Sequence, residues 1–202
     1  MKFSRRQYFK TTGLAASSLL VSTSYVNSDN WFSNIFKFNS KNNKDEVVGI
    51  PVEWIKIGGT VVYEYANYIL GLNLKNITPR MVIAPHFKRR GRTRNCLPPK
   101  SIWRKIEPTL DIVDELANVV GTPLDEIVSV YRSPEYNRAV RGKSRSYHMQ
   151  NQAIDISFKG TSSWRVAKAA KRLRDREKKF KGGVGTYSSF VHIDTRGKNT
   201  NW

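Results

Sequence analysis

The chain has 202 residues, of which 39% are hydrophobic and 25% are charged, a composition that suits one globular domain of ordinary size with a real core. Its 35 Lys and Arg outnumber its 16 Asp and Glu, and the net charge of +19 favours anionic partners such as nucleic acid, acidic lipid or the polymers of a bacterial envelope. The single cysteine, Cys96, excludes an intrachain disulfide and a four-thiolate zinc site, so any metal must be bound through His and carboxylate groups.

Residues 1–26 predict an export signal. A basic start is followed by a short run of apolar, Ser and Thr residues that is too short and too polar for a membrane span. Arg5 and Arg6 precede Phe9 and Lys10, which is the layout of a twin-arginine signal. We therefore expect export by a twin-arginine-type route to the periplasm or cell envelope, with the leader either cleaved or retained as an anchor. The alternative is a basic terminus without a targeting role.

The next segment, residues 27–45, is rich in Asn, Ser and Lys and predicts a flexible tether. Residues 46–202 then predict a single catalytic domain. Within it, the apolar and aromatic stretch Trp54–Leu74 predicts a strand followed by a helix. The basic stretch His86–Arg94 predicts a loop, in which His86 would be a loop residue or a contact to an anion.

The middle of the domain predicts a helix, a strand and a short helix. Apolar residues recur at intervals of three and four from Pro108 to Val120, which predicts a helix that Gly121 ends. Glu126–Tyr131 is rich in β-branched and aromatic residues and predicts a strand. Ser133 and Pro134 then predict the cap and first turn of a short helix.

A strand and a basic helix follow. Ala153–Phe158 alternates as a strand does, and Ser162 or Ser163 can cap an amphipathic helix. We expect Trp164 to pack in the core or at the start of this helix. The predicted apolar face of the helix consists of Val166, Ala169, Ala170 and Leu173.

Two short strands, Gly182–Tyr187 and Phe190–Thr195, are predicted at the C-terminal end, joined by a turn at Ser188 and Ser189. We expect the terminal Trp202 to dock on the domain. Helices and strands alternate without regular repetition, so the sequence predicts an α+β fold with a small, mainly antiparallel sheet flanked by helices.

The histidines near these strands are candidates for a metal site. Residues two apart in a strand share a face, so His192 and Asp194 should project together. If the two strands lie side by side, Asp155 joins them and His148 reaches them from the preceding loop. Two imidazoles, one carboxylate and a water form a catalytic zinc site, with the remaining carboxylate placed to act on the water. Spacing alone leaves open that each histidine only hydrogen-bonds an aspartate.

The order of short motifs resembles a known family. The chain contains S-x-H with A-x-D seven residues after the His, a preceding Y-R-S, and G-G-V-G-x-Y and F-V-H-x-D near its end. Over Glu126–Trp202 this resembles the peptidase M15 family of zinc D-Ala-D-Ala carboxypeptidases and murein endopeptidases. The resemblance implies a hedgehog/DD-peptidase-like fold, a Zn²⁺ cofactor and peptidoglycan peptides as substrates.

The resemblance also implies roles for particular residues. His148, Asp155 and His192 would bind the metal, and Arg132 would orient the peptide or stabilise the developing oxyanion. A fixed, permanently charged guanidinium suits that task. The alternative for Arg132 is an ion pair with a surface acid such as Glu135.

Two further residues and two departures from the family pattern complete the expected site. Ser146 and Tyr147 would line the substrate site, although Ser146 can equally hydrogen-bond the loop backbone. Asn151 stands where the family usually has Gly, and Asn tolerates the left-handed backbone conformation. Ser189 stands where many members have an acid, so Asp194 is the predicted general base.

The leading hypothesis is an exported zinc peptidase that acts on peptidoglycan stem peptides or cross-links, with its basic surface held on an anionic envelope. A second hypothesis, motivated by Ser189, is a wall-binding module that has lost hydrolysis. A third is a nucleic-acid-binding protein, motivated by the basic segments Lys88–Arg94 and Arg165–Lys181. The export signal argues against the third, so we expect no nucleic-acid partner.

Overall fold

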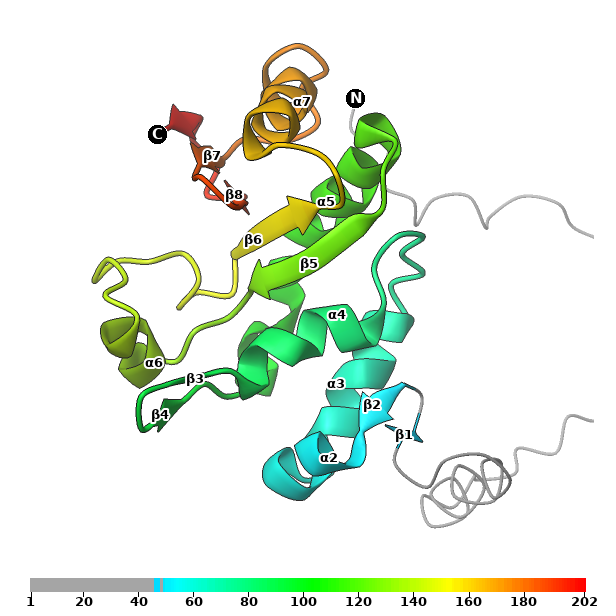
Figure 1. The fold of residues 1–202 in the computed structure, drawn as a ribbon, viewed down its shortest axis with the longest axis vertical. Coiled ribbons are helices and arrows are strands. Elements are labelled where there is room, and N and C mark those ends of the chain that lie inside the picture. Colours follow the sequence, from blue (N-terminus) through cyan, green and yellow to red (C-terminus); the bar gives the residue numbers. More distant parts are fainter. Residues whose placement is uncertain (1–45, 48) are drawn as a thin grey trace, which may run out of the picture. The chain divides into compact units, whose positions relative to one another are not determined.

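A computed structural model describes residues 46, 47 and 49–202 (Figure 1). These residues form an α+β fold around a five-stranded sheet of order β5-β6-β8-β7-β9. The pairs are antiparallel except that β7 and β9 are parallel. The strands of this sheet are β5 (Leu124–Ser129), β6 (Ala153–Phe158), β7 (Gly183–Thr186), β8 (Val191–Asp194) and β9 (Thr200–Asn201). The predicted α+β class with a mainly antiparallel sheet is confirmed, whereas the predicted signal and tether lie outside the described residues.

Helices and two small strand pairs make up the rest of the described chain. The helical elements are α2 (Val52–Gly58), α3 (Val61–Leu70), α4 (Pro79–Ile83), η2 (Ala84–Phe87), η3 (Lys100–Ile106), α5 (Glu107–Val120), α6 (Pro134–Ala139) and α7 (Ser163–Asp175). The strand pairs are β1 (Glu46–Val47) with β2 (Ile50–Pro51) and β3 (Arg89–Arg90) with β4 (Thr93–Arg94). Within the described part of the chain, no helix is both long and apolar enough to cross a membrane.

The two faces of the sheet have opposite character. Side chains alternate along β6 and β8, so Ile154 and Ile193 share one face while Asp155 and His192 share the other. The isoleucines are completely buried, in one core with apolar residues of α5 and α7. Figure 1 shows α5 passing behind β5 and β6. Helices therefore cover the apolar face, and the polar face is left for a site.

Two predictions for the first part of the domain were wrong. The stretch Trp54–Leu74 forms helices α2 and α3 rather than a strand and a helix. The buried residues of α3 recur at helical intervals: Val62, Tyr65, Ala66 and Ile69. The basic segment predicted as a loop instead begins with the end of η2 and forms the β3–β4 hairpin, whose turn includes Gly91 at a φ of +56°.

The predicted ends of three later helices are confirmed. Gly121 follows α5 in the left-handed conformation, with a φ of +73°. The Ser133 hydroxyl accepts a hydrogen bond from the Tyr136 amide at the start of α6. The Ser162 hydroxyl does the same for the amide of Arg165 at the start of α7.

The apolar face predicted for α7 is confirmed, but the prediction for Trp164 was wrong. Val166, Ala170 and Leu173 are buried, while Ala169 is half-buried against the same core. The Trp164 side chain is 64% exposed, with the Lys168 ammonium over its ring. The first turn of an amphipathic helix can point a large side chain to solvent, and helical periodicity does not specify that orientation.

His86 is a core residue, so its prediction as a loop residue or anion contact was wrong. It is 1% exposed and lies between the rings of Tyr65 and Tyr131. Its Nδ1 atom lies 3.2 Å from the carbonyl oxygen of Ile83, to which it donates in the neutral ring. Burial lowers the pKa of His86 to about 4, because charging the ring there would leave the cation without water.

This pKa predicts a pH-dependent stability. The folded-state value lies below the ordinary value of 6.5, so the contribution of neutral His86 is complete above that pH and is lost as the pH falls toward about 4. From pH 7.5 to pH 4.5, we expect the free energy of unfolding of the wild type to fall by about 2–3 kcal/mol more than that of His86→Gln. Urea denaturation at the two pH values measures both falls; equal falls would contradict the assignment.

Candidate metal centre

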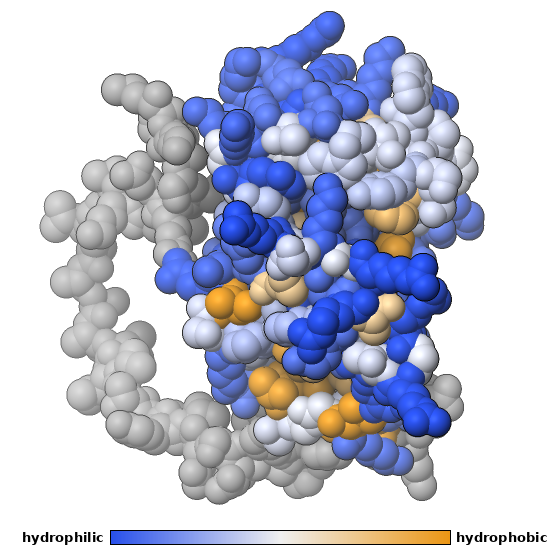
Figure 2. All heavy atoms as spheres, turned by 90° about the vertical axis from the view of Figure 1, so that its left-hand side faces the viewer, coloured by the Kyte–Doolittle hydropathy of each residue, from blue (hydrophilic) through white to orange (hydrophobic). Residues whose placement is uncertain are grey.

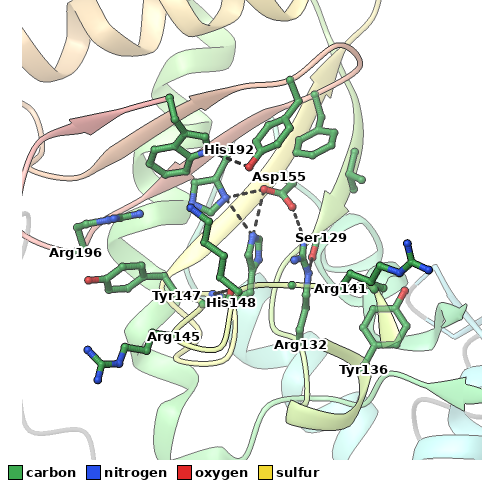
Figure 3. Close-up of a pocket in the computed structure, with 18 of the residues that line it drawn as sticks. Ser129, Arg132, Tyr136, Arg141, Arg145, Tyr147, His148, Asp155, His192 and Arg196 are labelled. Carbon is green, nitrogen blue, oxygen red and sulfur yellow. Dashed lines mark hydrogen bonds and ion pairs between the residues drawn. The ribbon is translucent and has the colours of Figure 1, made fainter. Parts of the chain in front are cut away.

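Three of the predicted residues converge on the polar face of the sheet (Figure 3). Asp155 on β6 lies directly opposite His192 on β8, and His148 reaches them from the loop after α6. The Asp155 Oδ1 atom lies 2.8 Å from His192 Nδ1 and 3.2 Å from His148 Nε2, and the two nitrogens are 3.1 Å apart. All three side chains are buried, and their ligand atoms are close enough to hold one metal ion.

In each imidazole, the outer nitrogen, which is the one that points away from Asp155, has its own hydrogen-bond acceptor. His148 Nδ1 lies 2.6 Å from the carbonyl oxygen of Val130, and His192 Nε2 lies 2.9 Å from Asp194 Oδ2. Donation to these acceptors places a proton on each outer nitrogen and turns the inner lone pairs toward Asp155. Two lone pairs and a carboxylate oxygen within about 3 Å of one another repel unless a cation lies between them. This donor set fits a divalent metal, and two His with one carboxylate suit zinc.

The pKa shifts of His148 and Asp155 agree with this arrangement, whereas that of His192 favours a protonated ring as long as no metal is bound. Burial lowers the pKa of His148, which keeps the ring neutral and able to act as a ligand. Burial alone would raise the pKa of Asp155, but the neighbouring imidazoles outweigh it and lower that pKa well below its usual range. For His192, burial lowers the pKa, but hydrogen bonds to Asp155 and Asp194 outweigh it and the net shift is upward.

Arg132 contacts the cluster from outside. Its Nη2 atom donates to Asp155 Oδ2 at 2.5 Å, and its Nε donates to the Ser129 hydroxyl at 2.7 Å. Asp155 therefore has one oxygen toward the imidazoles and the other toward a guanidinium. The alternative partner Glu135 lies instead beside Arg138, at 3.6 Å. Arg132 also lines the pocket, so its predicted role with substrate is compatible with this contact.

Asp194 is not among the residues that line the pocket, and its role as general base stays a prediction. Its side chain is completely buried, and it lies beyond the His192 ring, on the Nε2 side. Its Oδ1 accepts hydrogen bonds from the Gly183 amide at 3.0 Å and from Arg196 Nε at 2.7 Å. Burial would raise its pKa, but hydrogen bonds from Arg196 and His192 lower it. This placement favours a role in orienting His192 over proton transfer in the pocket.

The loop that carries His148 has the features expected of it. Asn151 has a φ of +56°, the left-handed conformation that the replacement of Gly by Asn tolerates. Its side chain is buried and its Nδ2 donates to the carbonyl oxygen of Ile102 at 3.0 Å, which anchors the loop. Ser146 and Tyr147 both line the pocket. The Ser146 hydroxyl also accepts from the His148 amide, at 3.3 Å.

The cluster lines a pocket of about 710 Å³. The face of the molecule shown in Figure 2 is largely hydrophilic, with scattered hydrophobic patches. Trp202 docks beside the pocket, as predicted, with its ring centroid 5.1 Å from that of His192. Sequence reasoning missed Arg196, whose guanidinium lies over the rings of Tyr147 and Trp202 at 4.2 and 5.1 Å. Its position two residues after Asp194, on the same face of an extended chain, was the available signal.

Two glycines of β7 leave space for the side chains of Asp194 and Trp202. A Cβ atom at Gly183 would lie 2.5 Å from Asp194 Oδ2, and one at Gly185 would lie 2.5 Å from the Trp202 ring. Side chains at these positions would push Asp194 and Trp202 away from β7. Gly183 and Gly185 of the G-G-V-G motif are therefore explained by the close approach of the site's side chains to the backbone.

A buried cluster of two imidazoles and a carboxylate that borders a pocket is the kind of site that metal-dependent hydrolases use. The peptidase M15 family model matches residues 85–194, more than half of the chain, so this chain belongs to the peptidase M15 family. The resemblance seen in its motifs is thereby confirmed.

Individual relatives are similar over part of their length. Proteins named peptidoglycan L,D-endopeptidase MepK from Escherichia coli K12 and Shigella flexneri are each 38% identical over 102 residues, or 46% of this chain. A protein named probable peptidoglycan L,D-endopeptidase MepK from Haemophilus influenzae is 38% identical over 77 residues, or 35% of this chain. The matched regions span 52% of the first two relatives and 38% of the third. No solved structure matches the chain significantly.

The geometry predicts that Asp194 would affect metal binding through His192. In Asp194→Asn the carboxylate that holds the His192 Nε2 proton is lost, so we expect zinc affinity to fall about 10–100-fold. Competition with a chromophoric chelator measures that affinity, and circular dichroism checks the fold. Unchanged zinc affinity with complete loss of peptide cleavage would instead support Asp194 as the general base.

Gly185→Ala tests the docking of Trp202. The new methyl group would overlap the indole ring, so we expect the ring to leave its place beside His192 while the zinc affinity changes little, because the ligands are untouched. Quenching of tryptophan fluorescence by acrylamide measures the ring's exposure. Trp202→Phe provides the control spectrum, and quenching equal to the wild type would contradict the prediction.

Proposed function

We propose that this protein is a zinc-dependent peptidase that hydrolyses peptide bonds of peptidoglycan stem peptides or cross-links. The observation that carries the proposal is the convergence of His148 Nε2, His192 Nδ1 and Asp155 Oδ1 within 3.2 Å of one another, with both outer ring nitrogens occupied. Membership of the peptidase M15 family supports peptide hydrolysis. The names of the relatives support peptidoglycan as the substrate.

The residues of the site would have two roles: to hold the metal ligands in their orientation and to stabilise charge on the substrate. A zinc ion bound there supplies a Lewis acid that polarises water and the peptide carbonyl. Asp194 holds the proton on His192 Nε2, and Val130 does the same for His148, so both ligands keep their orientation. Arg132 is anchored by Asp155 and Ser129 at the pocket wall, where its charge would stabilise a developing oxyanion.

Export would bring this activity to its substrate. The twin-arginine-type leader predicted in residues 1–26 motivates the proposal that the protein works in the periplasm or cell envelope. The positive net charge of +19 would hold it near anionic envelope polymers. Retention by an uncleaved leader would keep the domain close to the membrane.

One observation favours a second candidate, a metal-binding module without hydrolysis. Among the described residues that line the pocket, Asp155 is the sole acid, and it belongs to the cluster itself. Asp194 is turned away and Ser189 lies exposed in the turn between β7 and β8. A carboxylate free to accept a proton from water would then be missing, and the protein would bind stem peptides without cleaving them.

Measuring metal content and muropeptide cleavage on the same preparation distinguishes the two candidate functions. We expect about one zinc per chain by elemental analysis, with loss of both zinc and muropeptide cleavage in His148→Ala, because the cluster needs all three ligands. His86→Gln, which changes a buried histidine outside the cluster, is the matched control and should keep both. A chelator should abolish cleavage and added zinc should restore it. Bound zinc without cleavage of any muropeptide would select the binding module, and absence of zinc would refute both.

A further inference from the structure

The pocket around the cluster carries a large excess of positive charge. Six Lys and Arg line it, against the single acid Asp155 among its described lining residues. The six are Lys88, Arg132, Arg141, Lys143, Arg145 and Arg196. Such an excess is costly unless it is compensated, and it raises the local concentration of anionic ligands.

Three of these cations have acidic partners within the protein. Arg132 is paired with Asp155, and Arg196 with Asp194. Lys88 lies 2.6 Å from Glu126. These pairs compensate three of the six positive charges within the walls of the pocket.

The other three cations, which we call the basic rim, are Arg141, Lys143 and Arg145. They lie in the loop between α6 and His148, and all three are exposed. Within residues 46, 47 and 49–202, no ion pair joins the basic rim to an acid. The Lys143 ammonium lies 5.9 Å from the centre of the Trp202 ring, so the rim and this aromatic side chain border the same pocket.

The backbone that carries the basic rim is held by buried contacts. Asn137, which is 2% exposed, donates from Nδ2 to the carbonyl oxygen of Lys143 at 3.0 Å. Its own carbonyl accepts from the Gly142 amide at 2.8 Å. A Cβ atom at Gly142 would lie 2.1 Å from Asn137 Oδ1, so the glycine allows this close contact. The rim is therefore presented by a loop of defined conformation.

We propose that the basic rim binds carboxylate groups of the substrate and selects peptides that carry free carboxylates near the bond to be cleaved. Guanidinium groups bind carboxylates through paired, charge-assisted hydrogen bonds, and an ammonium adds a further donor. The Trp202 ring offers an apolar surface for the peptide between the rim and the metal ligands. This inference rests on the proposed peptidase function, since it concerns the substrate of the same site.

The test combines two peptides with two charge-matched variants. The peptides are a stem-peptide dimer with free carboxylates and the same dimer with those groups converted to carboxamides. The rim variant carries Arg141→Gln, Lys143→Gln and Arg145→Gln. The control variant carries Arg165→Gln, Lys168→Gln and Arg176→Gln, which removes the same charges on and next to α7, outside the pocket lining.

Binding and cleavage are measured separately on zinc-loaded protein, by fluorescence anisotropy of dye-labelled peptides before turnover and by kcat/KM. We expect the wild type and the control variant to prefer the free carboxylates about tenfold or more in affinity, since charge-assisted hydrogen bonds favour the charged form. The rim variant should lose this preference by weakening only for the carboxylate form. The preference in kcat/KM should follow, mainly through KM.

The outcomes distinguish the inference from the function on which it rests. Equal binding of both peptides by the wild type, or a preference kept by the rim variant, would overturn the carboxylate site. A preference lost equally in the control variant would also overturn it, because net charge alone would then explain the binding. Rim-dependent binding without cleavage of either peptide would support the rim and refute the peptidase function.

Discussion

The antiparallel pairing of β6 with β8 is the constraint on which the site depends, because it places Asp155 directly opposite His192. A slip of one residue in either strand would turn the ligand to the other face of the sheet. The isoleucines next to these two residues resist that slip, since Ile154 and Ile193 are completely buried in the core that α5 and α7 complete. The apolar core on one face thus determines the geometry of the cluster of His148, Asp155 and His192 on the other.

The two buried carboxylates of the site show how the protein compensates for their burial. Moving an unpaired carboxylate out of water costs on the order of several kcal/mol. Asp155 is shared between the imidazoles and Arg132, and Asp194 is shared between His192 and Arg196. Each acid thereby fixes an imidazole or a guanidinium in place. The same pairs that offset the cost of burial also orient the groups around the proposed metal ion.

These pairings also explain the polarity of the pocket. The acids are paired within the protein, while the cations of the loop after α6 lie at the rim of the pocket without acidic partners among the described residues. The site therefore combines a cluster suited to a divalent cation with walls suited to an anionic ligand. Both properties agree with a peptide substrate that is polarised at its carbonyl group and carries charge elsewhere.

Local patterns in the sequence were enough to predict several elements of the fold and the family of the chain. Alternation predicted β6 and β8, helical spacing and a terminal Gly121 predicted α5, and the motifs around His148, Asp155 and His192 placed the chain in its family. These features depend on neighbours within a few residues, so they are visible in the sequence. The burial of His86, the exposure of Trp164 and the turning of Asp194 toward Arg196 were decided only by tertiary structure. Each depends on which distant residues surround the side chain, and spacing along the chain does not contain that information.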